Sequence, residues 1–400
     1  MADSRGDYWR VDGMNDIAWK IDHGVFSIGQ VSGDVLTFDL GGRIIFATIS
    51  GRSYRRTIMN RFIEIIAVNG VRTTRELEYG EAQEIANVIY SRLGTLASDA
   101  GLSGNDEPGL SWMGKRDWEW LVSDAGKLSE IYGGGIPVIP PDQYFALYIR
   151  YTRGCSWNKC SFCRLYTGIN YAVGSVSSVL SHVNELRAVL GKGLDSRRTV
   201  FLGDANAINT RTSEVVKVIT ALRETLGLPV YAFSDAFTTP LSKSESDYSQ
   251  MHSAGLKRVY IGVESGSRRV LDILNKPMNL DTALAEMRQM KAAGIDLGVI
   301  IMAGAGGRAL AEDHIRDTSD FVAELPLSRG DVVYISPLVE YRDSPYYDTV
   351  TKERLGILSA PEKLAQAQIL KDRILSLWKE RNSSPPNFPV APYLLAESIY

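Results

Sequence analysis

The feature that most constrains the fold is a regular alternation of short apolar runs with amphipathic segments, which extends from about residue 144 to residue 347. Six of these runs have the length and the β-branched or aromatic content of buried strands: YFALYIRY, TVFLG, PVYAFS, RVYIGVE, DLGVIIM and DVVYISPL. Most of the segments between them repeat apolar residues at helical spacing. This alternation predicts an α/β fold with a parallel sheet, built either as an open doubly wound sheet or as an incomplete (β/α) barrel.

The region before this alternation has a different pattern. Between residues 24 and 51, short alternating runs separated by glycine-rich turns predict a small antiparallel sheet. Segments 79–97 and 110–133 have helical spacing, and the breaker-rich run GGGIPVIPPDQ predicts a linker. We therefore expect a smaller α+β region over residues 1–140, the strand–helix domain over 141–350, and a C-terminal helix and tail over 351–400 that packs on that domain.

The charge balance and the hydropathy argue against binding to nucleic acid and against insertion into a membrane. The formal net charge is −3, so no overall positive field attracts nucleic acid. No uninterrupted apolar stretch is long enough to cross a bilayer, and the polar N-terminus lacks the apolar core of a signal peptide. We expect a cytoplasmic protein that binds neither membranes nor nucleic acid.

All three cysteines of the chain, Cys155, Cys160 and Cys163, lie in the stretch RGCSWNKCSFC directly after the first predicted strand. In parallel sheets ligands bind at the C-terminal ends of the strands, so this loop occupies the expected position of an active site. An odd number of closely spaced thiols favours metal or cluster ligation over disulfides. A structural zinc would need a fourth ligand, and none of the histidines (His23, His182, His252 and His314) is adjacent in sequence, although zinc remains an alternative.

The cysteine stretch resembles the cluster-binding loop of the radical S-adenosylmethionine (radical SAM) superfamily, in which the commonest spacing has three residues, not four, between the first two cysteines. The resemblance is to the branch of the Elongator catalytic subunit and the HemN-type barrels, and it implies a partial (β/α)6 TIM-like barrel. It further implies that Cys155, Cys160 and Cys163 hold one [4Fe–4S] cluster, whose open iron binds S-adenosyl-L-methionine, and that Phe162 packs near the adenine.

Other segments resemble the same family in family order, over about residues 144–347. The family's Gly-Gly-Glu amine-binding motif matches Gly203 and Asp204, with Asp in place of Glu. The stretch GVESG places Glu264 and Ser265 near the ribose or methionine of the cofactor, and the fifth strand places Val299 and Met302 beside the adenine. Ser234, which ends the third strand with Asp235, is a further candidate for cofactor binding, although both residue types also favour turns.

The resemblance implies a reaction. A low-potential electron donor, such as a flavodoxin, a ferredoxin or a dedicated reductase, would supply one electron for cleavage of S-adenosylmethionine, and the 5′-deoxyadenosyl radical would abstract hydrogen from a small-molecule substrate. Because no cysteine remains for a second cluster or a thiol hydrogen donor, we expect dehydration, deoxygenation, decarboxylation or rearrangement, with a diol dehydratase of natural-product biosynthesis as one option. A tRNA-modifying enzyme and a non-catalytic iron–sulfur or zinc protein are the alternatives.

Several residues have both a functional and a structural interpretation. Glu264, Asp204 and Tyr166 are the catalytic candidates, although Tyr166 could equally be a core aromatic residue. The arginines of GRSYRRTIMNRF (Arg52, Arg55, Arg56 and Arg61) fit a solvated loop slightly better than an anion-binding or lid segment. The tryptophans Trp112, Trp118 and Trp120 are expected to pack the N-terminal region against the barrel.

Overall fold

A computed structural model describes residues 10–12, 16–30, 33–68, 71–103, 109–237 and 243–394. The chain divides into two compact units. The first unit comprises residues 1–147, 181–198 and 396–400, and the second unit comprises residues 148–180 and 199–395.

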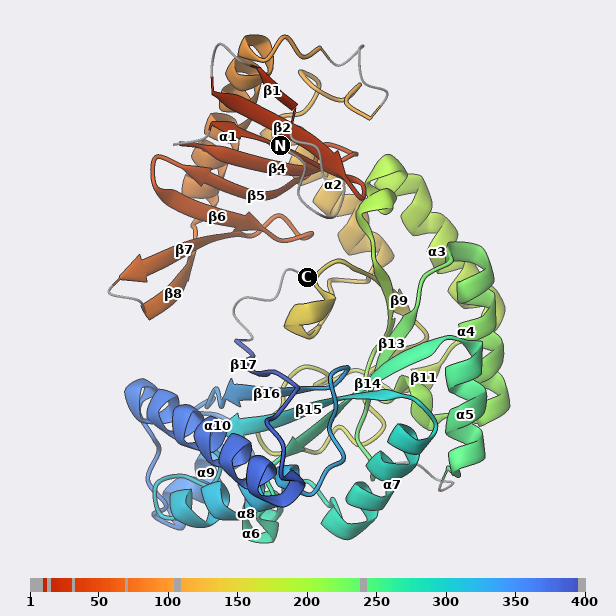
Figure 1. Cartoon of the computed structure of the whole chain (residues 1–400), viewed down its shortest axis with the longest axis vertical. Coiled ribbons are helices and arrows are strands. Elements are labelled where there is room, and N and C mark those ends of the chain that lie inside the picture. Colours follow the sequence, from red (N-terminus) through yellow and green to blue (C-terminus); the bar gives the residue numbers. More distant parts are fainter. Residues whose placement is uncertain are drawn as a thin grey trace. The chain divides into compact units, whose positions relative to one another are not determined.

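The first unit is built on an eight-stranded antiparallel meander in which each strand pairs with the next (Figure 1). Its strands are β1 (Arg10–Asp12), β2 (Ile17–Asp22), β3 (Val25–Gln30), β4 (Val35–Asp39), β5 (Ile44–Ile49), β6 (Arg52–Arg56), β7 (Phe62–Val68) and β8 (Val71–Glu76). Helices α1 (Tyr79–Asp99) and α2 (Trp118–Ile131) share one apolar core with strands β2 to β7. The predicted antiparallel sheet is thus confirmed and extends further than expected.

Two expectations for this unit were wrong. The helix predicted from residue 110 begins only at Trp118, because the Asp117 side chain caps it by accepting a hydrogen bond from the Trp120 N–H at 2.8 Å. The first part of the arginine-rich run is not a solvated loop: Arg52–Arg56 form β6, and their alternation buries Tyr54 and Arg56. Burial lowers the pKa of Arg56 to about 10.

The tryptophans of this unit lie in or beside its own core. Trp112 and Trp118 are buried there, and Trp120 is partly buried. The guanidinium groups of Arg43 and Arg116 lie over the ring of Trp120. These contacts give the three side chains a packing role within the first unit.

The second unit is built on a seven-stranded sheet in the order β17–β16–β15–β14–β13–β12–β9. Its strands are β9 (Ala146–Arg150), β12 (Thr199–Gly203), β13 (Val230–Ser234), β14 (Leu256–Glu264), β15 (Asp296–Ala303), β16 (Val332–Pro337) and β17 (Val390–Pro392). Neighbouring strands from β12 to β17 are parallel. The six predicted strands and the partial barrel are therefore confirmed, and β17 extends the sheet beyond β16.

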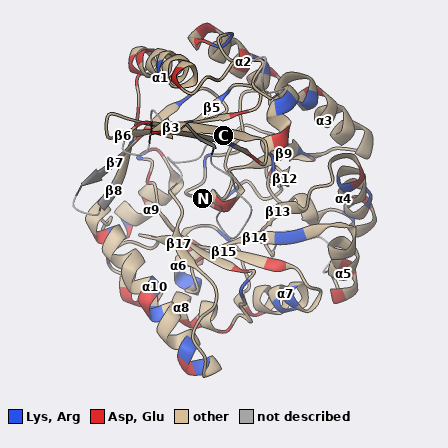
Figure 2. Cartoon of the chain, turned by 45° about the horizontal axis from the view of Figure 1, so that its top comes forward, with Lys and Arg blue, Asp and Glu red and all other residues tan. Residues whose placement is uncertain are grey.

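Helices connect these strands and lie along the outside of the sheet (Figure 1). They are α4 (Thr212–Leu226), α5 (Glu245–Ala254), α6 (Arg268–Ile273), α7 (Leu280–Ala292), α8 (Ala311–Ala323), α9 (Pro345–Lys352) and α10 (Ala360–Asn382). One more helix, α3 (Val176–Leu190), has residues in both units. Strands such as β15 are buried along nearly their whole length, which is why they read as continuous apolar runs. The helices carry both signs of charge (Figure 2). Among the described residues, no helix is long and apolar enough to cross a membrane.

Candidate active site

The three cysteines lie on a loop that follows β9 in the second unit. Two short strands, β10 (Thr152–Arg153) and β11 (Ala172–Val173), pair antiparallel and hold the ends of this loop together. Cys155, Cys160 and Cys163 are free thiols and are each partly buried. We call residues 153–166 the cysteine loop. It lies where the first strand of the partial barrel ends, as the sequence predicted.

The thiols share one electrostatic environment. Burial raises the pKa of all three, and that of Cys160 to about 12. The negative charges of Glu264 and of neighbouring thiols raise the pKa of Cys160 and Cys163 further, whereas the Lys276 ammonium lowers it. Because these groups act on one another, the thiols, Glu264 and Lys276 belong to one site.

The C-terminal end of helix α6 holds the cysteine loop from one side. The Ser161 hydroxyl donates to the Ile273 carbonyl at 2.7 Å, and the Ser161 N–H donates to the Leu274 carbonyl at 2.9 Å. The Trp157 indole donates to the Asn275 carbonyl at 2.9 Å, and the Asn275 amide donates to the Lys159 carbonyl at 2.6 Å. The loop thereby satisfies carbonyls that the last turn of a helix leaves without a partner.

Asp204, at the end of β12, anchors the start of the loop. Its buried carboxylate accepts hydrogen bonds from the Tyr148 hydroxyl, from Arg150 Nε at 3.1 Å and from the Gly154 N–H at 2.9 Å. At Gly203, a Cβ atom would lie 2.1 Å from the Tyr148 oxygen, so only glycine fits. Both carboxylate oxygens of Asp204 thus bond to the chain itself, which favours a positioning role. Its predicted contact with the cofactor amine stays a prediction.

A polar network joins the ends of β12 and β13 to the cysteine loop. Asn206 donates to Asp235 Oδ2 at 2.6 Å and to the Ser156 hydroxyl at 2.8 Å, and its amide nitrogen lies 4.0 Å from Cys155 Sγ. Asn209 donates to Asp235 Oδ1 at 2.9 Å and accepts from the Ser234 hydroxyl at 2.7 Å. Ser234 is thus linked to the cysteine loop through this network, and its hydroxyl bonds to the Asn209 amide. Its predicted contact with the cofactor stays a prediction.

Glu264 and Lys276 form a buried ion pair beside the thiols. Glu264 Oε1 lies 3.0 Å from Lys276 Nζ. Burial lowers the pKa of Lys276, but the charges of Glu264 and Cys160 outweigh it, so the pKa lies above its usual value. Glu264 has a φ of 63°, an uncommon conformation for a side chain of this size that is often found at functional sites.

The remaining predicted cofactor residues are buried or partly buried in the second unit. Phe162 packs on an apolar cluster that contains Met302, and Val299 is fully buried in β15. Ser265 is fully buried, and its hydroxyl lies 2.8 Å from Nδ1 of His314. The other nitrogen of that ring, Nε2, bonds to the Met302 carbonyl at 2.7 Å, so His314 links Ser265 to β15. This hydrogen bond gives the Ser265 hydroxyl a structural role. Direct cofactor contacts of these four residues stay predictions.

Tyr166 is buried near the thiols. Burial raises its pKa well above the usual range, and the charges of Asp204, Cys155 and Cys163 raise it further. Its hydroxyl forms no hydrogen bond with any residue that the structure describes. A phenol without a protein partner can bond to a ligand, so the structure leaves Tyr166 available for the predicted role.

Sequence reasoning gave no role to Lys276, Asn206, Asn209, Tyr148 or Arg150. Lys276 follows Asn275 in the stretch that resembles the family, and Asn206 and Asn209 follow β12 in DANAIN. Polar residues just after a strand are a usable signal, because the C-terminal ends of parallel strands meet at one edge. Tyr148 and Arg150 lie within β9, where the pattern alone indicates only a buried strand.

The donor set fits an iron–sulfur cluster better than zinc. Within the described residues, no three His, Cys, Asp or Glu side chains converge to hold a single metal ion. His314 in the second unit is already bonded to Ser265 and Met302, so it is not a fourth ligand. A cluster binds one thiolate per iron and needs no convergence of three thiols on one ion.

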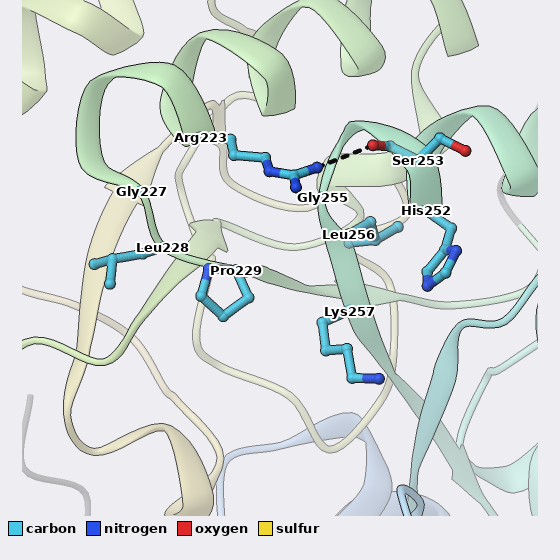
Figure 3. A pocket seen from close by; sticks show the side chains of 9 residues that line it. All are labelled: Arg223, Gly227, Leu228, Pro229, His252, Ser253, Gly255, Leu256 and Lys257. Atoms are coloured by element: carbon cyan, nitrogen blue, oxygen red, sulfur yellow. Dashed lines mark hydrogen bonds between the residues drawn. The ribbon is translucent and has the colours of Figure 1, made fainter.

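A surface pocket lies elsewhere in the second unit. Its cavity of about 520 Å³ is lined by residues that precede β13 and β14 and by the first residues of β14, among them Arg223, His252 and Lys257 (Figure 3). Arg223 donates to the Ser253 carbonyl at 3.1 Å within it. The pocket therefore lies at the N-terminal ends of strands whose C-terminal ends carry Ser234 and Glu264. Since active sites of such sheets form at the C-terminal ends, this pocket is not the candidate active site.

Part of the chain is similar to known proteins. Residues 149–322 match the family model described as the Radical SAM superfamily. A curated relative, 4′-phospho-dehydrooxetanocin synthase of Priestia megaterium, is 25% identical over 211 residues, which cover 47% of this chain and 28% of the relative. The chain thus spans little more than a quarter of that protein's length.

Two solved structures resemble the fold. The cobalamin-dependent S-adenosylmethionine radical enzyme OxsB with aqua-cobalamin bound is 18% identical, with a TM-score of 0.43 over 54% of this chain and 37% of that one. Coproporphyrinogen III oxidase (HemN) from Escherichia coli is 15% identical, with a TM-score of 0.41 over 58% of this chain and 52% of that one.

Proposed function

We infer from the match of residues 149–322 to the Radical SAM superfamily model that this chain belongs to that superfamily and is an enzyme of radical chemistry on a small molecule. The cofactors of this family are a [4Fe–4S] cluster and S-adenosyl-L-methionine. The observation that carries the proposal is the position of three thiols on one partly buried loop, at the end of the first barrel strand and beside a buried ion pair.

Cys155, Cys160 and Cys163 would hold the cluster, one thiolate for each of three irons. When it is bound and reduced, the cluster supplies the electron that splits the sulfonium of S-adenosylmethionine into methionine and a 5′-deoxyadenosyl radical. Every other task falls to the protein. Phe162, Val299 and Met302 would form the apolar side of the site, which suits an adenine ring and keeps water away from a radical.

The polar side of the site is built from the ends of β12, β13 and β14. Lys276 compensates the negative charge of three thiolates, because its ammonium is buried and lowers their pKa. Asp235 is oriented by Asn206 and Asn209 and can accept hydrogen bonds from a bound hydroxyl or amine. Tyr166 and Glu264 are the groups we propose to contact the cofactor or the substrate.

We propose a small-molecule substrate and a reaction that needs one cluster: dehydration, deoxygenation, decarboxylation or rearrangement. The curated relative is named as the synthase of a phosphorylated small molecule, which supports a small substrate over tRNA. A cytoplasmic, reducing location would keep the three thiols free, and a flavodoxin, a ferredoxin or a dedicated reductase would supply the electron.

Anaerobic reconstitution tests this proposal. We expect about four irons and four sulfides per chain in the wild type, and release of 5′-deoxyadenosine from S-adenosylmethionine in the presence of dithionite. Cys160→Ser should lose the iron and the cleavage while the barrel stays folded by circular dichroism. Binding of zinc without iron, or a reduced cluster that leaves S-adenosylmethionine intact, would contradict the proposal and favour a non-catalytic metal protein.

A further inference from the structure

The segment around the cysteines has a charge that differs from the rest of the chain. From Gln143 to Asn184 the sequence contains no Asp or Glu, although the whole chain has 47 acidic and 44 basic residues. Four basic residues lie in the part of this segment nearest the thiols: Arg150, Arg153, Lys159 and Arg164. A local excess of one sign in a chain of the opposite net charge indicates a surface for a charged partner.

Three of these four cations face outward. Arg150 turns inward to Asp204, whereas Arg153, Lys159 and Arg164 are exposed. Arg153 and Lys159 form no ion pair with any described residue. Arg164 lies 4.4 Å from the ring of Tyr341 and pairs with Asp343, so it is held in place at the surface.

Aromatic and apolar side chains accompany these cations. Lys159 Nζ lies 5.2 Å from the ring of Trp157, which packs edge-on against Phe237 at 6.0 Å. Leu165 and Tyr341 are each 39% exposed, which is high for residues of their size. Arginine and exposed aromatic residues are typical of the centre of protein–protein interfaces, and such interfaces are surrounded by charged residues. We call Arg153, Trp157, Lys159, Arg164, Leu165 and Tyr341 the basic face.

The basic face is the part of the protein that lies next to the thiols in sequence. Lys159 precedes Cys160, Arg164 follows Cys163, and Arg153 is two residues before Cys155. A protein that delivers an electron to this site must approach closely, since electron transfer slows steeply with distance. A partner on the basic face would meet that requirement.

We propose that the basic face docks an acidic, one-electron carrier protein of the flavodoxin or ferredoxin kind. This inference rests on the proposed function and identifies the surface and the charge of the partner. In each encounter the reduced carrier loses one electron, and the cluster held by the three cysteines gains it. The positive surface raises the association rate with an acidic carrier, and the aromatic residues supply the contact area.

An RNA partner is less well matched to this surface. Each phosphate contact needs its own cation, and specific RNA or DNA binding uses many of them. The basic face has three outward cations, one of which already pairs with Asp343. A protein surface with a few carboxylates around an apolar centre fits this arrangement better.

The test compares charge reversal on the basic face with charge reversal elsewhere. The variants are Arg153→Glu/Lys159→Glu and the milder Arg153→Gln/Lys159→Gln, and the control is Arg373→Glu on the exposed side of α10. The probe is an oxidised acidic flavodoxin, whose binding to reconstituted protein is measured by titration calorimetry, with stopped-flow association rates. A second readout is 5′-deoxyadenosine release driven by the reduced flavodoxin or by dithionite.

We expect the Glu variant to associate roughly 10- to 100-fold more slowly at low salt, with the Gln variant between it and the wild type. The difference should vanish near 1 M salt, where the screening length is about 3 Å. Flavodoxin-driven turnover should fall at least tenfold more than dithionite-driven turnover.

Equal binding by the Glu variant and Arg373→Glu, or binding that does not depend on salt, would overturn the proposal. Tighter binding of tRNA than of flavodoxin, lost in the Glu variant, would assign the face to RNA instead. Failure of the wild type to cleave S-adenosylmethionine with dithionite would refute the proposed function. The flavodoxin-binding measurement does not depend on cleavage, so it would still show whether the basic face binds an acidic carrier.

Discussion

The buried pair of Lys276 and Glu264 offers the sharpest test of how the site is built. The two side chains are 6% and 11% exposed, and the atoms Nζ and Oε1 lie 3.0 Å apart. Removing one partner of such a pair leaves a buried charge without compensation, which costs about 3–5 kcal/mol. We therefore expect Lys276→Met to destabilise the end of β14 by about 3 kcal/mol or more.

Hydrogen–deuterium exchange of peptides that cover residues 256–264 measures this cost in cluster-free protein. Since 1.4 kcal/mol corresponds to a tenfold change in an equilibrium constant, a loss of about 3 kcal/mol raises the population of the open state roughly a hundredfold. The amides of β14 should therefore exchange roughly a hundredfold faster in Lys276→Met. The matched control is Lys257→Met on the same strand. Lys257 pairs with Asp296 at 3.1 Å but is 49% exposed, so its loss should cost about 1 kcal/mol or less.

The double variant Lys276→Met/Glu264→Gln completes the cycle. It removes both charges together, so its cost should be smaller than the sum of the single variants by more than about 1 kcal/mol. Additive costs, or exchange in Lys276→Met that equals the Lys257→Met control, would refute the conclusion that the two charges compensate each other beside the thiols.

Three further predictions concern the residues around the loop. Burial lowers the pKa of His314 from 6.5 to about 4, so on acidification the imidazole is protonated in the unfolded chain before it is protonated in the folded protein. The stabilising contribution of neutral His314 is therefore complete above about pH 6.5 and falls by on the order of 3 kcal/mol toward pH 4. The difference in melting temperature between the wild type and His314→Gln should narrow over that pH range. Asp204→Asn weakens the hold on Gly154 and Arg150, so it should retain less iron after gel filtration than the exposed control Asp272→Asn, and equal iron would contradict a positioning role. Gly203→Ala places a Cβ 2.1 Å from the Tyr148 oxygen and should lower stability by about 1–3 kcal/mol in thermal melts; an unchanged melt would show that the ring can move.

Much of the second unit was predictable because its strands are buried on both faces. Continuous apolar runs separated by amphipathic segments leave few alternatives to a parallel sheet, and the structure has all six predicted strands. β17 was not predictable, because three residues, Val390–Pro392, carry no pattern and become a strand only by pairing with β16. The start of α2 was predicted eight residues too early, at residue 110 and not at Trp118. A single capping aspartate, Asp117, decides where this helix begins, and the apolar spacing does not indicate it.

Two features of the candidate site were predictable from the sequence: its three cysteines and its position at the C-terminal ends of the parallel strands. The cysteines are close in sequence, so their spacing is visible. Lys276 reaches the thiols because α6 turns the chain back toward the loop, and Asn206 reaches Cys155 from another strand. Such contacts join residues 50 or more positions apart, and the pattern of a single sequence does not reveal them. The buried Arg56 was missed for a related reason: exposure is the usual fate of arginine, and only the alternation within β6 buries it.

The extra residue between Cys155 and Cys160 now has a structural explanation. Four residues, not three, separate these cysteines, and the middle two both anchor the loop. Trp157 donates to the Asn275 carbonyl, whereas Asn158 turns the chain with a φ of 47° and donates its side-chain amide to the Tyr166 carbonyl at 2.8 Å. The Asn158 N–H also donates to Cys155 Sγ at 3.4 Å. The longer spacing thus accommodates a left-handed turn that links both ends of the cysteine loop.

Substitutions at Asn158 separate the turn from the side-chain bond. Asn158→Gly keeps the left-handed backbone and loses one hydrogen bond, which is worth about 1 kcal/mol. Asn158→Ala loses the same bond and must also hold a conformation that costs a residue with a Cβ roughly 1–2 kcal/mol. Opening of the loop exposes its thiols, so alkylation of Cys155 by iodoacetamide, followed by mass spectrometry at fixed pH, reports the difference. We expect rates about 5-fold above wild type for Gly and at least another 5-fold higher for Ala. Equal rates for Gly and Ala would mean that the turn at Asn158 does not hold the loop, and that Trp157 and Ser161 alone fix it on α6.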